Sequence, residues 1–243
     1  MPEDTQRMPG PAAGPGASRA DPPPSGNQAV GYRVVLPPGW SQIPVRSGTR
    51  EAIKRIVDKT FAQPPDGVSR DQLTPYRIEL ERRLSAAAAQ ARRNGGVHLY
   101  LPVTLRHGAP IAASFVVSEG SLGSLEDISP DMVVSALAAE EAAAGGDGDG
   151  TVTVDGVRSL RREHTAPQDP GQEEIGSGSR RVDYVIPVPG QQDRWLLIAF
   201  STLGGGDPDD QFARILVDLF DAIMSTFQWS GTGSAARDGG PRD

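Results

Sequence analysis

The sequence has 243 residues, a net charge of −7 and no cysteine, and 51 of its residues are glycine or proline. These residues follow no collagen period, and no apolar run approaches the roughly 20 residues that cross a bilayer, so collagen, coiled coils and membrane channels are excluded. The charge argues against a general nucleic-acid binder, and the lack of cysteine removes disulfides, thiolate zinc sites and cysteine nucleophiles. Because no signal-peptide pattern begins the chain, we expect a cytoplasmic protein without an integral membrane segment.

Composition divides the chain into a body and two ends. Residues 1–29 are rich in proline and glycine, and neither they nor residues 230–243 show a periodic apolar pattern. We expect both ends to be disordered tails, because such segments cannot bury enough apolar surface to fold. Residues 30–229 are then expected to form a single domain, since a chain of that length can bury a full core.

In the first half of the body, the residue pattern predicts two short strands and two helices. Strands are expected at 32–36 and 43–45. A helix capped by Thr49 runs to about residue 62, a break follows at 64–67, and a longer helix with Pro75 at its first position ends at 93. The apolar spacing predicts that the longer helix buries Tyr76, Leu80, Leu84, Ala87 and Ala91.

The alternation of apolar and polar residues over 97–117 predicts a β-hairpin. Apolar and polar residues alternate from 97 to 106, which indicates a half-buried strand with one face in water, and they alternate again from 111 to 117. Residues 107–110 form the connecting loop. Pro102 lacks a backbone donor, which favours an edge position or a local bulge for its strand.

The second half predicts one more helix and four strands. The helix spans about 129–144, and the turn Asp155–Gly156 joins the first two strands as a hairpin. Strands are expected at 151–154, 157–164, 182–188 and 195–202. The last of them is apolar on both faces, so we expect it at the centre of a sheet that is covered, at least in part, on both sides.

The final helix carries the strongest local signals. Asp207 is expected to cap it and Pro208 to be its first residue. Its apolar spacing predicts that the side chains packed on the sheet are Phe212, Ile215, Leu216, Leu219, Phe220, Ile223 and Phe227. Trp40, Trp195 and Trp229 are expected in or at the edge of the core. Helices and hairpins mix without a βαβ rhythm, so the fold class is α+β, with a largely antiparallel sheet of about six to eight strands and helices packed on it.

Chemical motifs are scarce. His98, His107 and His164 lack the spacing of a helical metal site, and all three are expected to be solvated. The acidic turn that starts at Asp147 fails the EF-hand pattern, the glycine-rich stretches fail the phosphate-loop pattern, and no G-x-S-x-G elbow is present. The sequence therefore predicts no catalytic, cofactor-binding or metal-binding residue and no cofactor.

Charge is distributed unevenly along the chain. Residues 46–106 carry 12 basic and 6 acidic side chains, whereas residues 119–155 carry 9 acidic and no basic ones. The two regions either face each other in the fold or form a docking surface for a charged partner. The residues predicted to bind a partner, on the polar side of the longer helix, are Arg77, Arg82, Arg83, Arg92 and Arg93; an ordinary solvated helix face is the alternative.

The Leu36–Trp40 segment, the paired hairpins, the strand at 195–202 and the closing residues 227–229 together resemble two groups of proteins. One is a group of uncharacterised actinobacterial proteins, and the other, more distantly, is the PsbP-like α/β sandwich with its P-x-G-W segment. Helices at 49–62 and 75–93 depart from the compact PsbP-like pattern. The resemblance implies a protein that works by binding and assembly, and it assigns no functional residue.

Three functions follow as hypotheses. The first is a non-catalytic protein–protein interaction module, an assembly factor or chaperone-like protein with another protein as its partner, in one version linked to a secretion system. The second is a small-molecule or lipid-binding domain with a cavity between the sheet and the helices at 49–62 and 75–93. The third is a hydrolase with a dispersed site, which requires a histidine within hydrogen-bond reach of a serine or an acid.

Overall fold

The computed structural model describes residues 29–63, 69–103, 111–121, 128–143, 150–166, 179–202 and 207–231. The elements are β1 (Ala29–Arg33), β2 (Trp40–Pro44), α1 (Thr49–Thr60), α2 (Arg70–Arg93), β3 (Gly96–Pro102), β4 (Ala113–Ser121), α3 (Pro130–Ala143), β5 (Thr151–Val154), β6 (Val157–Ala166), β7 (Ser179–Pro187), β8 (Arg194–Thr202), α4 (Gln211–Met224) and β9 (Gln228–Gly231). The expected break at 64–67, the loop at 107–110 and the two tails fall almost entirely outside the described residues. None of the described helices is long and apolar enough to cross a membrane.

Seven strands form one antiparallel sheet in the order β2-β3-β4-β8-β7-β6-β5, and β1 pairs with β9 in a separate two-stranded ribbon. The α+β class and the antiparallel sheet are thus confirmed. The strand predicted to be central, β8, lies fourth of seven between β4 and β7. The predicted turn at Asp155–Gly156 is also present: both residues have a positive φ, as a two-residue hairpin turn requires.

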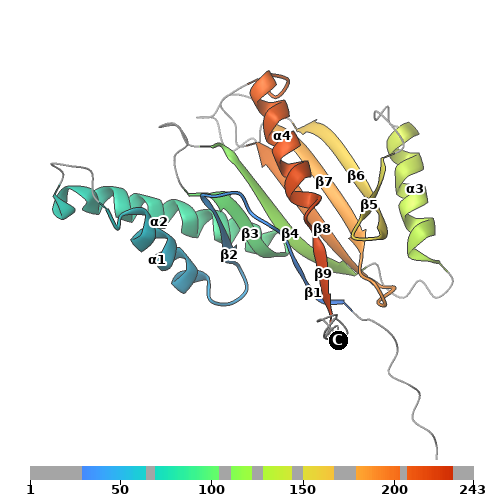
Figure 1. Cartoon of the computed structure of the whole chain (residues 1–243), viewed down its shortest axis with the longest axis horizontal. Coiled ribbons are helices and arrows are strands. Elements are labelled where there is room, and N and C mark those ends of the chain that lie inside the picture. The colour runs from blue at the N-terminus through green and yellow to red at the C-terminus, as the bar shows by residue number, and fades with distance from the viewer. Residues whose placement is uncertain are drawn as a thin grey trace, which may run out of the picture.

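Helices cover both faces of the sheet (Figure 1). Side chains of cross-strand partners share a face, and the partners Leu99, Val116, Ala199, Asp183 and Arg162 form one row across five strands. α1 and α2 cover this face at the β2–β3 end, and α3 covers it at the β6–β5 end. The opposite face carries α4, so the basic α1–α2 region and the acidic α3 region lie at opposite ends of the sheet.

Two hydrophobic clusters hold these layers together. The cluster under α4 is rich in stacked rings, including Phe115, Phe200 and Phe220, all at most 1% exposed. The cluster under α1 and α2 is aliphatic, and its buried members are Ile43, Val45, Ile53, Ile56, Val57, Leu84, Ala88, Ala91 and Leu99. Trp40 and Trp195 are buried and Trp229 is partly buried against the first cluster, as predicted.

The helix starts differ from the expected ones. Gly48, with φ +74°, precedes α1, and the Thr49 hydroxyl does not cap the helix but donates to the carbonyl of Pro44 at 2.7 Å. α2 begins five residues before Pro75, because Ser69 and Gln72 form a reciprocal capping box. α4 is capped by Asp210, which accepts from the amide of Ala213, and not by Asp207.

The predicted buried stripes are also partly wrong. In α2, Tyr76 is 67% exposed and Ala87 is exposed, while Leu84, Ala88 and Ala91 are buried. In α4, Phe212 and Ile215 are 54% and 51% exposed, whereas Ala213, Val217 and Met224, which were not predicted to pack on the sheet, are buried. Leu219 packs partly buried against the core. Both helices are rotated about their axes relative to the prediction, because apolar residues on both flanks made two stripes equally compatible with the spacing.

The first hairpin strand also differs. β3 is an interior strand without a wet face: Leu99 packs under α1 and α2, and Tyr100, only 3% exposed, packs under α4. Pro102 is tolerated because it is the last residue of β3, past the point where pairing with β4 ends at Tyr100. The first strand, β1, spans 29–33 and not 32–36.

Candidate functional site

The free edge of β2 is closed to an added strand. Backbone hydrogen bonds link Val45 to Val97 and Val103 to Gly39. The backbone N–H and C=O groups of odd-numbered β2 residues therefore point toward β3, and those of even-numbered residues point away from the sheet. Of the outward residues, Trp40 donates its amide to Pro37, and Pro44 has no amide and accepts from Thr49. Only Gln42 keeps both backbone groups available, so this edge does not favour recognition by strand addition.

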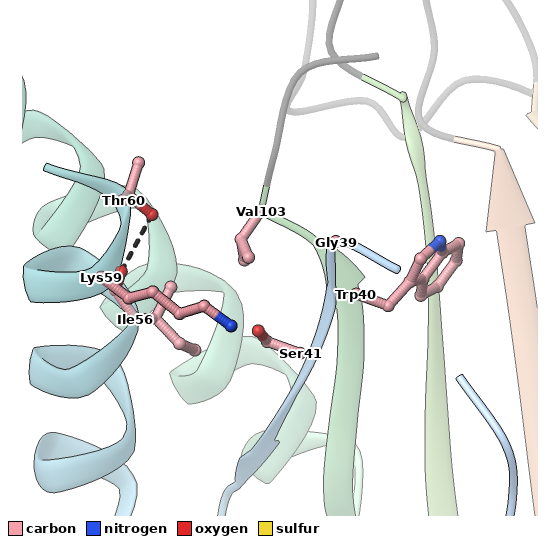
Figure 2. Close-up of a pocket in the computed structure, with 7 residues that line it drawn as sticks. All are labelled: Gly39, Trp40, Ser41, Ile56, Lys59, Thr60 and Val103. Carbon is pink, nitrogen blue, oxygen red and sulfur yellow. Dashed lines mark hydrogen bonds between the residues drawn. The ribbon is translucent and has the colours of Figure 1, made fainter. Parts of the chain in front are cut away.

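A pocket of about 400 Å³ lies between this strand and the last turns of α1 (Figure 2). Its lining residues are Gly39, Trp40, Ser41, Ile56, Lys59, Thr60 and Val103. The aliphatic cluster fills space between the sheet and the first two helices, and the pocket is a part that stays open. This position satisfies the geometric requirement of the small-molecule hypothesis, in a volume within the usual range for ligand pockets.

Two sequence features open the pocket. Gly39 has φ +89°, a conformation that favours glycine, and it turns the chain into β2. The indole of Trp40 points away from Lys59 (Figure 2) and packs near Phe115, with ring centroids 5.8 Å apart. The largest side chain of the segment thus lies on the other face of the sheet, and a hollow remains beside the short side chain of Ser41.

Lys59 is the only ionisable side chain among the lining residues that the structure describes. Its ammonium group reaches across the hollow toward the hydroxyl of Ser41 (Figure 2), and it forms no ion pair with another described residue. The neighbouring Asp58 is occupied elsewhere, because it pairs with Arg77 at 2.5 Å. The Thr60 hydroxyl is also occupied, since it donates to the carbonyl of Ile56 at 2.9 Å.

The lining therefore offers one cation, one free hydroxyl and an apolar wall from Ile56 and Val103. Among the described residues that line it, none is a histidine, a carboxylate or another group that commonly acts as a general base. No group of three or more metal-ligating side chains occurs among the described residues either. The described lining residues thus offer groups that can contact and orient a molecule.

The five predicted partner-binding arginines are spread along α2. Arg77 pairs with Asp58 and lies 5.6 Å from the ring centre of Phe61, and Arg82 and Arg83 both bond Glu79. Hydrogen bonds from these two arginines lower the pKa of Glu79 to about 2. Arg92 and Arg93 lie in the last turn, where positive charge suits the helix dipole. Their role in partner binding stays a prediction, and none of them lines the pocket.

The two described histidines, His98 and His164, are partly buried and not fully solvated as expected. His98 is half-buried, and its Nδ1 is hydrogen-bonded to the Tyr32 hydroxyl at 2.7 Å; the Tyr32 hydroxyl is also hydrogen-bonded to that of Tyr100 at 3.0 Å. Burial lowers the pKa of His98, and burial raises that of Tyr32. His164 is 36% exposed and lies 3.9 Å from Asp183, and His107 falls outside the described residues. Neither described histidine lies within hydrogen-bond distance of a serine or an acid, so these two residues do not support the hydrolase hypothesis.

A second polar cluster fastens α4 to the sheet. Arg161 on β6 makes two bonds to Asp221 on α4, at 3.1 and 2.7 Å, and Tyr184 donates to the same carboxylate at 2.9 Å. Arg161 and Arg180 also bond Glu163. Partial burial by itself would raise the pKa of Glu163, but these hydrogen bonds outweigh it and lower the pKa. Every charge in this cluster has an intramolecular partner, which identifies it as a structural contact.

The sequence prediction missed Lys59 and Ser41. A compositional signal was available, because the chain has 22 arginines and only two lysines, Lys54 and Lys59, both on α1. No local motif marks Ser41, whose place beside Lys59 depends on how β2 and α1 pack.

No protein-family model matches the chain, and no curated protein matches it. Among solved structures the chain is similar to LpqN, described as involved in cell envelope biogenesis of Mycobacterium tuberculosis, with 12% identity, a TM-score of 0.43, and coverage of 84% of this chain and 86% of LpqN. It is also similar to a mutant of protein Mog1, with 12% identity, a TM-score of 0.37, and coverage of 86% of this chain and 98% of that one. Similarity at this level supports no inference about function.

Proposed function

We propose that this protein is a non-catalytic binding module that holds a small, largely apolar molecule in the pocket between α1 and β2. The observation that carries the proposal is the hollow itself: about 400 Å³ left open beside an otherwise filled aliphatic cluster. The hollow opens to solvent, because Lys59 and Thr60 are exposed, and its volume falls within the roughly 300–1,000 Å³ of ligand pockets. A water-sized group takes up about 30 Å³ of liquid. The space therefore suits a ligand of roughly a dozen non-hydrogen atoms.

The test is titration of the uniformly ¹⁵N-labelled full chain with decanol and, separately, with decanoate. We expect saturable shifts of the amide signals of Gly39, Ser41 and Thr60 with at least one of the two. Val103→Phe, which places a ring in the hollow, should abolish these shifts. The matched control is Val35→Phe, because Val35 is 69% exposed and does not line the pocket. Unchanged amide signals with both probes would refute the proposal.

A second candidate function, docking of another protein, is favoured by a different observation. Phe212 and Ile215 stand one turn apart on the outer flank of α4, and each is more than half exposed. Arg214 and Asp218 on the same helix are exposed and form no ion pair with another described residue. In an antiparallel pair of α4 helices, Arg214 of one copy can face Asp218 of the other, so a second copy of the chain is the partner that this surface fits.

Sedimentation of the full chain over a range of concentrations tests this docking surface. We expect a monomer–dimer equilibrium that the double change Phe212→Ser with Ile215→Ser shifts to monomer. A purely monomeric wild-type chain at the highest concentrations would reject the dimer. The protein-assembly role predicted for the five arginines on α2 is separate, and Arg82→Ser with Arg83→Ser should leave this equilibrium unchanged.

A further inference from the structure

We infer that the ligand of the α1–β2 pocket is a singly charged amphipathic acid whose carboxylate binds between Lys59 and Ser41. This inference rests on the proposed function, and it adds the chemical class of the ligand. It starts from Lys59, an exposed residue that forms no ion pair with another described residue. The ammonium group projects into the hollow, and the nearest acidic side chain along the helix, Asp58, is already paired with Arg77. A cation that lines a hollow without a protein counter-ion favours an anion in that hollow.

The second group that a carboxylate needs is also present. The hydroxyl of Ser41 faces Lys59 across the hollow and has no hydrogen bond to another described group. A carboxylate placed between them has two oxygens and can accept from the ammonium group and the hydroxyl together. Ile56 and Val103 provide an apolar wall for a hydrocarbon chain, and no other described lining residue carries a charge.

The place of the pocket in the fold limits the charge of the ligand. Lys59 and Thr60 are the last two residues of α1, so the negative end of the helix dipole lies at the pocket. A phosphate, with close to two negative charges, would be repelled more strongly than a carboxylate and would lack the guanidinium fork that usually holds it. One ammonium group and one hydroxyl match a single carboxylate.

The rarity of lysine provides a direct measurement. Reductive methylation with ¹³C-formaldehyde labels the two lysines and the amino terminus and keeps their charges, so the full chain gives a methyl spectrum that Lys54→Gln and Lys59→Gln assign. We expect decanoate to shift the Lys59 signal and leave the Lys54 signal in place. Decanoate should bind about tenfold more tightly than decanol or better, because a hydrogen bond to a charged group adds at least that order of affinity. Lys59→Gln should remove the preference and the matched control Lys54→Gln should keep it.

The outcomes separate the two proposals. If decanoate and decanol bind equally and the Lys59 signal does not move, the acid assignment is wrong and the pocket still binds apolar molecules. If neither probe binds, both proposals fail. A decanoate preference that survives Lys59→Gln would also overturn the assignment, because the carboxylate would then lie elsewhere.

Discussion

The two helical layers of this protein pack on the sheet with different kinds of side chain. Under α4 the core is aromatic and continuous, and Phe220 alone contacts the rings of Phe115, Tyr184 and Phe200. Under α1 and α2 the buried residues are aliphatic, and the layer stops short of the strand edge, where the pocket opens. One face of the sheet thus carries a continuous aromatic cluster, and the other carries an aliphatic cluster beside an open hollow.

The largest expected effect is on the α4 side. Phe220→Ala removes a ring that is completely buried, and it should lower the free energy of unfolding by about 3–5 kcal/mol because it also leaves a cavity. Phe212→Ala, on the same helix but 54% exposed, should cost less than about 1 kcal/mol. Urea denaturation of both variants measures the difference. Equal losses would show that α4 is packed on the sheet by its other flank.

A smaller effect is expected from the polar cluster that fastens α4. Arg161→Ala leaves the carboxylate of Asp221 with one bond in place of three, and it should cost about 1–3 kcal/mol. Arg162→Ala on the same strand removes only partly exposed ion pairs on the opposite face, and it should cost less than about 1 kcal/mol. If thermal unfolding ranks the two arginines in the reverse order, the cluster does not hold the helix.

The His98 cluster should make stability depend on pH. Burial lowers the pKa of His98 in the folded state, with Glu119 acting to raise it and Arg46 to lower it, and the unfolded value is near 6.5. The unfolded chain then binds more protons below pH 6.5, so stability is fully present above that pH and falls as the pH drops through it. Unfolding free energies from pH 8 to 5 should show this loss, and His98→Gln should reduce it. An unchanged pH profile in that variant would exclude His98 as its source.

The smallest stability effect is expected at the pocket itself. Lys59→Gln and Lys54→Gln should each change the free energy of unfolding by no more than about 0.5 kcal/mol, because neither removes a buried contact or an ion pair with a described residue. Chemical denaturation measures this. A large loss in Lys59→Gln alone would make Lys59 a structural residue and weaken its assignment as a ligand-binding one.

Most helices and strands could be predicted from the sequence. The prediction failed where two neighbouring residues fitted the same local pattern for a helix cap or a buried position. Asp155–Gly156 and the strand at 195–202 were predicted correctly, since a two-residue turn and a doubly apolar strand leave little choice. Asp207 and Asp210 are both competent caps, and Phe212 and Ala213 both fit an apolar stripe, so only packing against the sheet decides between them.

The pocket also could not be predicted from local sequence patterns. Its existence depends on the indole of Trp40 turning to the far face and on where α1 ends relative to β2, which are tertiary facts. From the sequence, a cavity between the sheet and these helices was only a requirement of the small-molecule or lipid-binding hypothesis. Its lining, with Lys59 opposite Ser41, could not be derived from spacing along the chain.

Photo-crosslinking tests the central claim most directly. A decanoic acid that carries a diazirine on its hydrocarbon chain is bound to the full protein, irradiated, and located by peptide mass spectrometry. The account predicts that label is concentrated on residues 39–41, residues 56–60 and Val103, and that excess unlabelled decanoate prevents it. Label concentrated on α4, or on β6 and β7 beneath it, would contradict the assignment of the binding site to the α1–β2 pocket.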